Sequence, residues 1–316
     1  MKAIVYRRFG PPDVLELADV AEPRLRRGEA LVRVEAAALN PKDVLVRKGR
    51  MRWAGALTLP RTPGYDFAGQ IERLHPSVQS SAGVAVGDEV FGMVQAMRGG
   101  TCAELVAVPT DELAPRPRGL SAERAAALPL VALTALQALR DLGELRAGQR
   151  LLVNGASGGV GTVALQIARA RGAQITAVCS AANAAMVRAL GADEVIDYNE
   201  QDPTSGERRY HVFFDTFGNR RYADARRVLL DEGRYVTTVP NARSLRQEVL
   251  GRLGLSRARL VVVRSRRRDL ENIATLVEVG VLEPVIDRVL PLEKSAEAHA
   301  HLETRRARGK VVLTVG

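Results

Sequence analysis

The chain has 316 residues, 46% of them hydrophobic, which predicts a globular protein with an apolar core and, from its length, two domains. It contains no run of eighteen apolar residues and no apolar segment near its start. We therefore expect neither a membrane span nor an export signal, and a cytoplasmic location. The net charge of +10 would permit nucleic-acid binding, but the arginines are scattered and lack interleaved aromatic residues, which disfavours it.

The first 123 residues predict a β-rich, barrel-like domain, because short apolar or alternating segments are separated by proline and glycine turns. One short helix is expected to begin at Asn40-Pro41, since proline is favoured in the first helical turn. The predicted strands are Lys2–Tyr6, Glu16–Ala18, Glu29–Ala37, Phe67–Arg73, the end of Val86–Gly92, and Thr101–Val108.

Helical periodicity follows over Ser121–Leu142, and strands then alternate with helices. The helices include Gly159–Arg171 and Asn183–Leu190. This alternation predicts an α/β domain with a parallel, doubly wound sheet. The predicted strands are Arg150–Asn154, Gln174–Cys179, Glu194–Asp197, His211–Thr216, Gly233–Thr238 and Arg259–Val263.

The last segment departs from this alternation. It predicts a helix, a strand, a helix and a strand over Asp269–Gly316, and we expect it to return to the first domain. The first domain would then be discontinuous, formed by residues 1–123 and 265–316, and residues 124–264 would form the second.

A glycine cluster lies between the strand that ends at Asn154 and the helix that follows. Strand, glycine turn and helix form the context of a dinucleotide-binding fingerprint. Glycine lets the backbone approach a pyrophosphate, and the helix start offers free N–H groups. Read as G-x-G-x-x-G, the frame falls on Ala156, Gly158 and Gly161, so alanine replaces the first glycine.

Several segments resemble one family in order and in spacing: the medium-chain dehydrogenase/reductase superfamily, in its zinc-independent, zeta-crystallin-like quinone oxidoreductase branch. The resemblance spans the whole chain. The segments that carry it are Asn40–Asp43, Pro63–Gly69, Gly87–Gly92, Ala126–Pro129, Asn154–Gly161, Leu190–Asp193 and Arg308–Val312.

This resemblance implies a GroES-like, barrel-like substrate domain interrupted by a Rossmann domain, with the active site in the cleft between them. It also implies NAD(P)H as hydride donor and a homodimer. The coenzyme-binding residues that follow from the resemblance and the strand ends are Asn40, Pro41, Thr134, Ala156, Ser157, Gly158, Gly159, Val160, Gly161, Ser180, Asn183, Tyr198, Thr216, Phe217, Val239, Pro240 and Arg308.

Zinc-dependent members of the family need cysteine, histidine or carboxylate ligands. In the matching positions this chain has Asn40 in place of a cysteine and Tyr65 in place of a histidine, so no metal is predicted. Without a Lewis acid, quinones and α,β-unsaturated carbonyls are the favoured acceptors, because hydride addition gives a delocalised anion. Tyr65 and Asn40 are the catalytic candidates, as hydrogen-bond donors to that anion; the alternative is that both only line the cleft.

The second Rossmann strand ends in Cys179-Ser180 and lacks the carboxylate that binds the ribose 2′-hydroxyl of NAD. Ser180 and Asn183 are able to bind a 2′-phosphate instead, or only to cap the next helix. The sequence therefore favours NADPH over NADH. Two other functions stay open: an enoyl-thioester reductase, and a low-turnover NADPH-binding protein with an RNA-binding or structural role.

Overall fold

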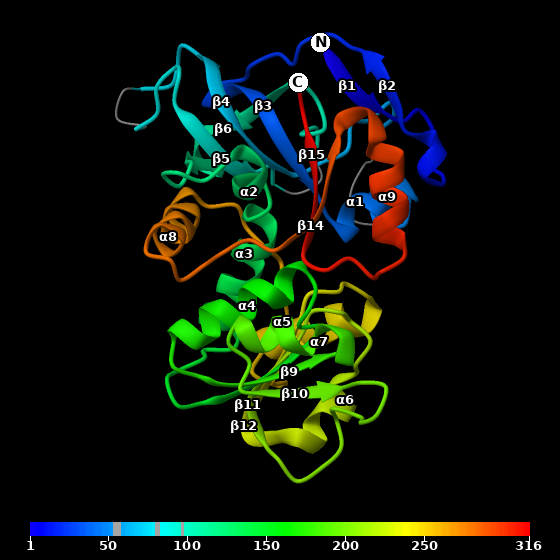
Figure 1. The fold of residues 1–316 in the computed structure, drawn as a ribbon, viewed down its shortest axis with the longest axis vertical. Coiled ribbons are helices and arrows are strands. Elements are labelled where there is room, and N and C mark those ends of the chain that lie inside the picture. The colour runs from blue at the N-terminus through cyan, green and yellow to red at the C-terminus, as the bar shows by residue number, and fades with distance from the viewer. Residues whose placement is uncertain (53–57, 80–82, 96–97) are drawn as a thin grey trace. The chain divides into compact units, whose positions relative to one another are not determined.

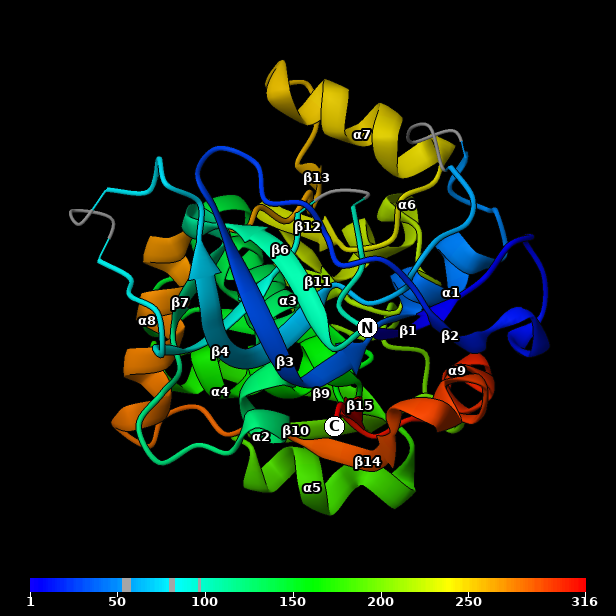
Figure 2. The ribbon, with the colours of Figure 1, turned by 90° about the horizontal axis from the view of Figure 1, so that it is seen from above.

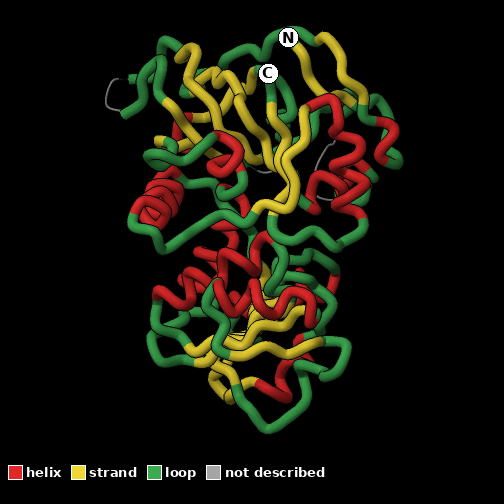
Figure 3. The backbone as a smooth tube through the Cα atoms, viewed as in Figure 1, coloured by secondary structure: helices red, strands yellow, loops and turns green. Residues whose placement is uncertain are grey.

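The computed structural model describes residues 1–52, 58–79, 83–95 and 98–316, and it divides into two compact units. The first unit consists of residues 1–130, 264–280 and 284–316, and the second of residues 131–263 and 281–283. The domain division expected from the sequence, at 123/124 and 264/265, stays a prediction; the compact units meet at 130/131 and 263/264. Each unit has its own sheet, drawn in yellow in Figure 3.

The first unit is β-rich and discontinuous in sequence. Its elements are β1 (Lys2–Val5), β2 (Glu16–Asp19), β3 (Glu29–Leu39), α1 (Pro41–Arg47), β4 (Asp66–Leu74), β5 (Glu89–Met93), β6 (Leu105–Pro109), β7 (Leu113–Pro115), α2 (Ala122–Ala126), α8 (Arg267–Glu278), β14 (Ile286–Pro291), α9 (Ser295–Glu303) and β15 (Lys310–Thr314).

Strand β3 organises the first unit. It pairs along one edge with β4, and along the other edge with β6 in its first half and β15 in its second. Nine of its eleven residues are buried, as in a strand covered on both faces. Figure 2 shows β3, β4 and β6 side by side. The pairing of β3 with β15 places residues 36–39 beside residues 311–314, so the N-terminal and C-terminal segments of this unit share one sheet.

The second unit contains the parallel sheet and its helices. Its elements are α3 (Pro129–Gln137, which begins just before the boundary), the π-helix Ala138–Leu142, β8 (Arg150–Asn154), α4 (Gly159–Ala170), β9 (Gln174–Cys179), α5 (Ala184–Ala189), β10 (Glu194–Asp197), β11 (Tyr210–Asp215), α6 (Tyr222–Ala225), β12 (Leu229–Thr237), α7 (Ala242–Arg252) and β13 (Ala258–Leu260).

The six strands of this unit are parallel, in the order β10-β9-β8-β11-β12-β13. That is the 3-2-1-4-5-6 order of a Rossmann sheet, and the order reverses between β8 and β11. In Figure 1, α4 and α5 lie over the face of β9 and β10. The predicted α/β fold class, a doubly wound parallel sheet with a β-rich second domain, is confirmed.

Most predicted elements differ from the structure by a residue or a few at their ends, and three differences have a clear cause. The strand expected at Thr101–Val108 begins only at Leu105, because Cys102 instead accepts a hydrogen bond from Ile4 of β1. Strand β12 begins at Leu229 rather than Gly233, since Leu229 already pairs with Tyr210. Strand β7 was not predicted, and its three residues are too few for a periodicity.

The segment Ala122–Leu142 is helical, and by length and composition alone it would be able to cross a membrane. In the structure, 78% of its most apolar window is buried inside the protein. Such burial is typical of a core helix, whose apolar faces all meet other protein atoms.

Candidate active site

The glycine turn lies at the carboxyl end of β8. Gly155 has a φ of +80°, a conformation that favours glycine. A Cβ on Gly161 would come within 2.3 Å of the Gly155 carbonyl oxygen, so only glycine allows α4 to pack on the turn. Ala156 has a negative φ and is fully buried. The first glycine of the fingerprint is therefore replaceable here, because the left-handed position is Gly155.

Gly158 has a different role from the two packing glycines. It is the N-cap of the twelve-residue helix α4, and no side chain caps that helix. A Cβ on Gly158 would meet only the Gly155 carbonyl oxygen, at 3.5 Å, and otherwise open space. Open space before an uncapped helix start, with the positive end of the helix dipole, fits a phosphate group.

Polar side chains gather where β8 and β11 end, next to this turn. The Nδ2 of Asn154 donates to Oδ1 of Asp215 at 2.8 Å, and the hydroxyl of Tyr235 donates to Oδ2 of Asp215 at 2.8 Å. Thr216 donates to the Asn154 carbonyl at 2.8 Å. The Asp215 carboxylate is fully buried and bonded through both oxygens, so it holds the strand ends together.

The other predicted coenzyme residues of the second unit have varied exposure. Phe217 is exposed, Val239 and Pro240 are half-buried, and Thr134 is buried in α3. Three predicted residues, Asn40, Pro41 and Arg308, belong to the first unit, where Pro41 and Arg308 are exposed. That one coenzyme contacts all of these residues stays a prediction.

The end of β9 holds a carboxylate that was not predicted from the sequence. Asn183 donates to the Ser180 hydroxyl at 3.2 Å, and Tyr198 is exposed. Asp197 pairs in register with Cys179, and its Oδ2 accepts the backbone N–H of Ala181 at 3.0 Å. An acid therefore lies beside Ser180 although none follows it in sequence, because parallel neighbours bring their ends to one edge.

A second polar group, in the first unit, is built from side chains rather than backbone. We call Asn40, Asp66 and Lys310 the buried triad. The Nζ of Lys310 donates to Oδ1 of Asn40 at 2.5 Å and to Oδ2 of Asp66 at 2.9 Å. The Nδ2 of Asn40 donates to the same Asp66 oxygen at 2.9 Å. The other Asp66 oxygen accepts the backbone N–H of Leu130 at 2.8 Å.

All three residues of the triad are 4% exposed or less. A buried charge pair needs further hydrogen bonds to its members, and here Asn40 bonds both charges and the Leu130 N–H bonds Asp66. The amide of Asn40 also donates to the Ala38 carbonyl at 3.3 Å, so both of its N–H groups have protein partners. A catalytic role for Asn40 as a donor to substrate stays a prediction, and these partners count against it.

Asp43 supports the same region from the first turn of α1. Its carboxylate accepts the backbone N–H of Asn40 at 2.9 Å and that of Gly64 at 2.7 Å. Burial raises its pKa to about 6, against these two hydrogen bonds, which lower it. Asp43 thus joins the start of α1 to the segment that carries Tyr65.

Tyr65 is 1% exposed, and its hydroxyl has no hydrogen-bond partner among the residues that the structure describes. Burial raises the pKa of the Tyr65 phenol and the charge of Asp43 raises it further, while the nearby Arg61 opposes both. The phenol therefore keeps its proton at any neutral pH. The ammonium of Lys42 lies 3.8 Å from the centre of the Tyr65 ring, a cation–π contact.

A catalytic zinc does not fit this site. Over residues 1–52, 58–79, 83–95 and 98–316, no group of three histidine, cysteine or carboxylate side chains is placed to hold a metal ion. Asn40 and Tyr65 offer an amide that is already bonded and a phenol that stays protonated, both poor ligands for Zn²⁺.

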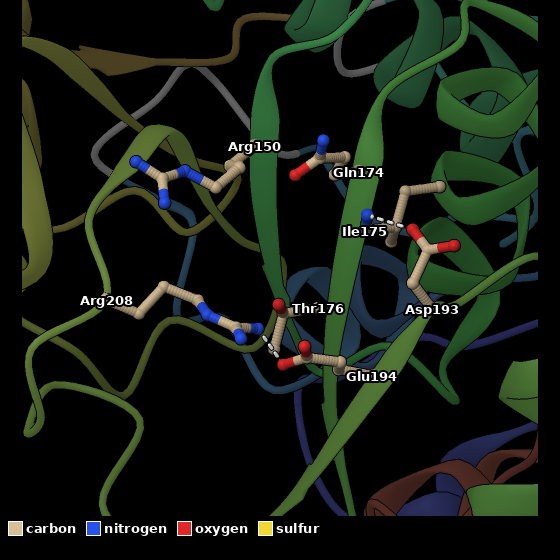
Figure 4. A pocket seen from close by; sticks show the side chains of 7 residues that line it. All are labelled: Arg150, Gln174, Ile175, Thr176, Asp193, Glu194 and Arg208. Carbon is tan, nitrogen blue, oxygen red and sulfur yellow. Dashed lines mark hydrogen bonds and ion pairs between the residues drawn. The ribbon is translucent and has the colours of Figure 1, made fainter.

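The cavity shown in Figure 4 lies elsewhere, at the amino ends of β8, β9 and β10, with a volume of about 360 Å³. Arg150, Gln174 and Glu194 line it, and Glu194 pairs with Arg208. Ligands of parallel α/β sheets bind at the carboxyl ends of the strands. This cavity is therefore at the wrong edge for a dinucleotide.

Comparison with known proteins agrees with this geometry. Residues 26–118 match the family described as "Alcohol dehydrogenase GroES-like domain", and residues 190–313 match "Zinc-binding dehydrogenase". The chain is 34% identical to the bovine (Bos taurus) "NAD(P)H oxidoreductase RTN4IP1, mitochondrial", over 100% of this chain and 89% of the relative. The chain belongs to the medium-chain dehydrogenase/reductase superfamily.

Two further relatives place the chain in the quinone oxidoreductase-like branch of this superfamily. One is the "NADPH-dependent alkenal/one oxidoreductase, chloroplastic" of Arabidopsis thaliana, 34% identical over 99% of this chain and 79% of the relative. The other is the solved quinone oxidoreductase of Coxiella burnetii, with a TM-score of 0.90 and 32% identity, covering 100% of this chain and 99% of that one. The predicted resemblance is confirmed.

In this medium-chain dehydrogenase/reductase, the glycine turn was predictable from the sequence, whereas Asp66, Lys310 and Lys42 were not predicted as site residues. Lys310 is 244 residues from Asp66, and no spacing rule relates them. The one available signal was register: Lys310 begins a predicted strand, and antiparallel pairing of β15 with β3 brings it to Asn40.

Proposed function

We propose that the protein is an NADPH-dependent reductase of quinones or α,β-unsaturated carbonyls that works without zinc. The observation that carries this proposal is the open, uncapped start of α4 behind a turn that only glycine can form. Gly158 to Gly161 would hold the coenzyme's phosphates through backbone N–H groups. The bound coenzyme would supply a hydride.

The residues of the first unit favour a conjugated acceptor. Hydride addition to a simple ketone places a full charge on one oxygen, which usually requires a Lewis acid or a strong proton donor. Quinones and enones spread that charge over several atoms. The Tyr65 phenol, protonated and without a partner among the described residues, is suited to donate a hydrogen bond to the anion's oxygen.

The preference for NADPH over NADH rests on the end of β9. Ser180 and Asn183 offer a hydroxyl and an amide at the end of β9, and Tyr198 is exposed beside them. Asp197 opposes a 2′-phosphate, but its carboxylate accepts backbone N–H groups of Ala181 and Asn199. The name of the Arabidopsis relative specifies NADPH, and that of the bovine relative specifies NAD(P)H.

The alternatives are an enoyl-thioester reductase and a low-turnover NADPH-binding protein that binds RNA. No described residue favours either over the proposal. The experiment is a fluorescence titration with NADPH and with NADH, followed by coenzyme oxidation with a panel of quinones, simple enones and enoyl thioesters. We expect tighter NADPH binding and turnover of quinones or enones. Turnover of thioesters alone, or salt-sensitive RNA binding without turnover, would contradict the proposal.

We also propose that a second copy of the chain is a partner, through the free edge of β13 and the adjacent α7. Strand β13 is last in its sheet, and Figure 2 shows α7 beside it. Leu245, Val249, Leu253 and Leu255 are exposed on this surface, which is unusual for large apolar side chains. The mass in solution should be that of a dimer, and of a monomer for Val249→Glu. A wild-type monomer would contradict this assignment.

The absence of membrane and nucleic-acid partners stays a prediction, as does a cytoplasmic location. The bovine relative's printed name places that protein in mitochondria.

A further inference from the structure

Lys42 occupies an unusual place beside Tyr65. It is the second residue of α1, between the exposed Pro41 and the buried Asp43. Its Nζ lies over the face of the Tyr65 ring at 3.8 Å from the centroid, and its side chain is half-buried. Tyr65 is almost inaccessible, whereas Lys42 keeps part of its surface exposed. Of the two side chains, Lys42 is the more exposed.

The groups around Lys42 partly balance its charge. Asp43 on the same helix and Asp66 on β4 stabilise its ammonium form, and Arg61, which precedes Tyr65, opposes it. Asp66 already shares its charge with Lys310. Burial dominates these effects and lowers the pKa of Lys42 to about 8. The amine and the ammonium are therefore both populated near neutral pH.

Lysine is a rare residue in this chain, which makes its presence at position 42 notable. The chain has five lysines against 41 arginines, so its cations are overwhelmingly arginine. An arginine keeps its proton at all working pH values, whereas a half-buried lysine is able to release one. Two of the five lysines, Lys42 and Lys310, lie around Asn40, Tyr65 and Asp66. Position 42 thus has a cation that is able to release a proton, unlike the arginines.

We propose that Lys42 is a catalytic residue, the proton donor that delivers a proton to the α carbon when an α,β-unsaturated carbonyl is reduced. This inference rests on the proposed function and deepens it. It assigns two tasks to neighbouring side chains: Tyr65 holds the carbonyl oxygen, and Lys42 completes the reaction at carbon.

The step balances in atoms and electrons. A hydride from the reduced nicotinamide forms the new C–H bond at the β carbon, and the electron pair of the C=C bond moves to give an enolate. The enolate then takes a proton from the Lys42 ammonium, which forms the second C–H bond at the α carbon. Lys42 is left as a neutral amine and regains a proton from solvent. A quinone needs no such step, because its reduced anion leaves and is protonated in water.

The first test compares Lys42→Met and Lys42→Arg with the wild type on an enone and on a quinone, from about pH 6 to about pH 10. Wild-type enone turnover should fall as pH rises through about 8, because the ammonium is lost. Both variants should reduce the enone about 100-fold more slowly and without that fall, and should keep quinone turnover within about fivefold. The control is Lys48→Met, which removes a half-buried lysine at the other end of α1 and should leave both activities unchanged.

Two readouts separate proton donation from a structural role. Reduction of 2-methylcyclohex-2-enone in D₂O should place deuterium at the α carbon with one configuration for wild type, and with mixed configuration for Lys42→Met. In ¹³C-dimethylated protein, one of the five lysine signals should titrate near pH 8 and be absent in Lys42→Met.

Equal loss of enone and quinone turnover in Lys42→Met, an unchanged pH profile, or unchanged α-carbon configuration would each overturn the assignment. Failure of the wild type to oxidise NADPH with any quinone or enone would instead overturn the proposed function itself. The quinone activity of the variants therefore distinguishes the two failures.

Discussion

The glycine turn of the second unit and the buried triad of the first are built in opposite ways. The turn is made by backbone, within residues 154–161 of one strand–turn–helix segment. The triad is made by side chains, and Lys310 is 270 residues from Asn40. The turn depends on the absence of a side chain, since a Cβ on Gly161 would not fit. The triad depends on three groups being present together, and each becomes costly when another is removed.

The largest effect should come from breaking the triad. Lys310→Met leaves the Asp66 carboxylate fully buried beside Asn40 without its cation. Removing one partner of a buried ion pair lowers the free energy of unfolding by about 3–5 kcal/mol. Urea unfolding monitored by circular dichroism measures this change. The exposed pair of Lys2 with Asp19 is the control, and Lys2→Met should leave the midpoint unchanged.

A double variant tests whether the loss belongs to the pair. Asp66→Asn combined with Lys310→Met removes both charges, and it should recover much of the stability that Lys310→Met loses. Losses that simply add would show that the two charges do not interact, and would contradict the account of the triad.

The second effect concerns the turn. Gly158→Asp places a carboxylate in the open space before α4, where a phosphate is proposed to bind. We expect NADPH affinity to fall by about 100-fold or more through charge repulsion, with little change in Tm. Gly158→Ala adds a Cβ in ordinary contact and should weaken binding far less. Gly161→Ala should lower Tm, because its Cβ would meet the Gly155 carbonyl at 2.3 Å. Unchanged affinity of Gly158→Asp would remove the turn from the coenzyme site.

His299 shows a further effect of packing in the first unit. It is fully buried in α9, and burial lowers its pKa to about 3 from 6.5. In the unfolded chain the His299 imidazole binds a proton below about pH 6.5, whereas in the folded protein it does so only below about pH 3. Stability from this group is therefore complete above pH 6.5 and is lost as pH falls, by about 2 kcal/mol at pH 5. His299→Leu should flatten the unfolding free energy between pH 6.5 and 5, and an unchanged slope would count against the burial.

Tyr65→Phe should give the smallest of these effects. It removes only a hydroxyl that has no partner among the described residues, so the fold should keep its stability. We expect quinone turnover to fall about tenfold through the loss of one hydrogen bond to the anion, with NADPH affinity unchanged. Steady-state kinetics and a coenzyme titration separate the two quantities. Full activity in Tyr65→Phe would leave Tyr65 as a wall residue.

The contrast between the glycine turn and the buried triad also shows which parts of the site could be predicted from the sequence. Strand β8, the glycine turn and α4 are contiguous, so their periodicity and glycines predict them together. The frame on Ala156, Gly158 and Gly161 contains the helix start and the close-packed glycine, but it does not identify the left-handed residue, which is Gly155. Backbone φ values of this kind are invisible in a residue pattern.

The triad could not be predicted in the same way. Asp66 and Lys310 lie in segments that carry the family resemblance. Their ion pair, however, is created by strand pairing across the sheet and not by residues close in sequence. Asp197 beside Ser180 has the same origin. Lys42 was visible as a lysine after Asn40-Pro41, and only its contact with the Tyr65 ring and its burial give it chemical meaning.

The most direct test follows a labelled hydride. NADPH carrying deuterium at the transferring C4 position is mixed with an enone and with protein that has been treated with a chelator. The account predicts one deuterium at the β carbon of the product and a zinc content far below one atom per chain. It also predicts that the chelator-treated protein reacts as fast as untreated protein does with the same labelled coenzyme. Product without deuterium, or activity that disappears with the metal and returns with added zinc, would contradict it.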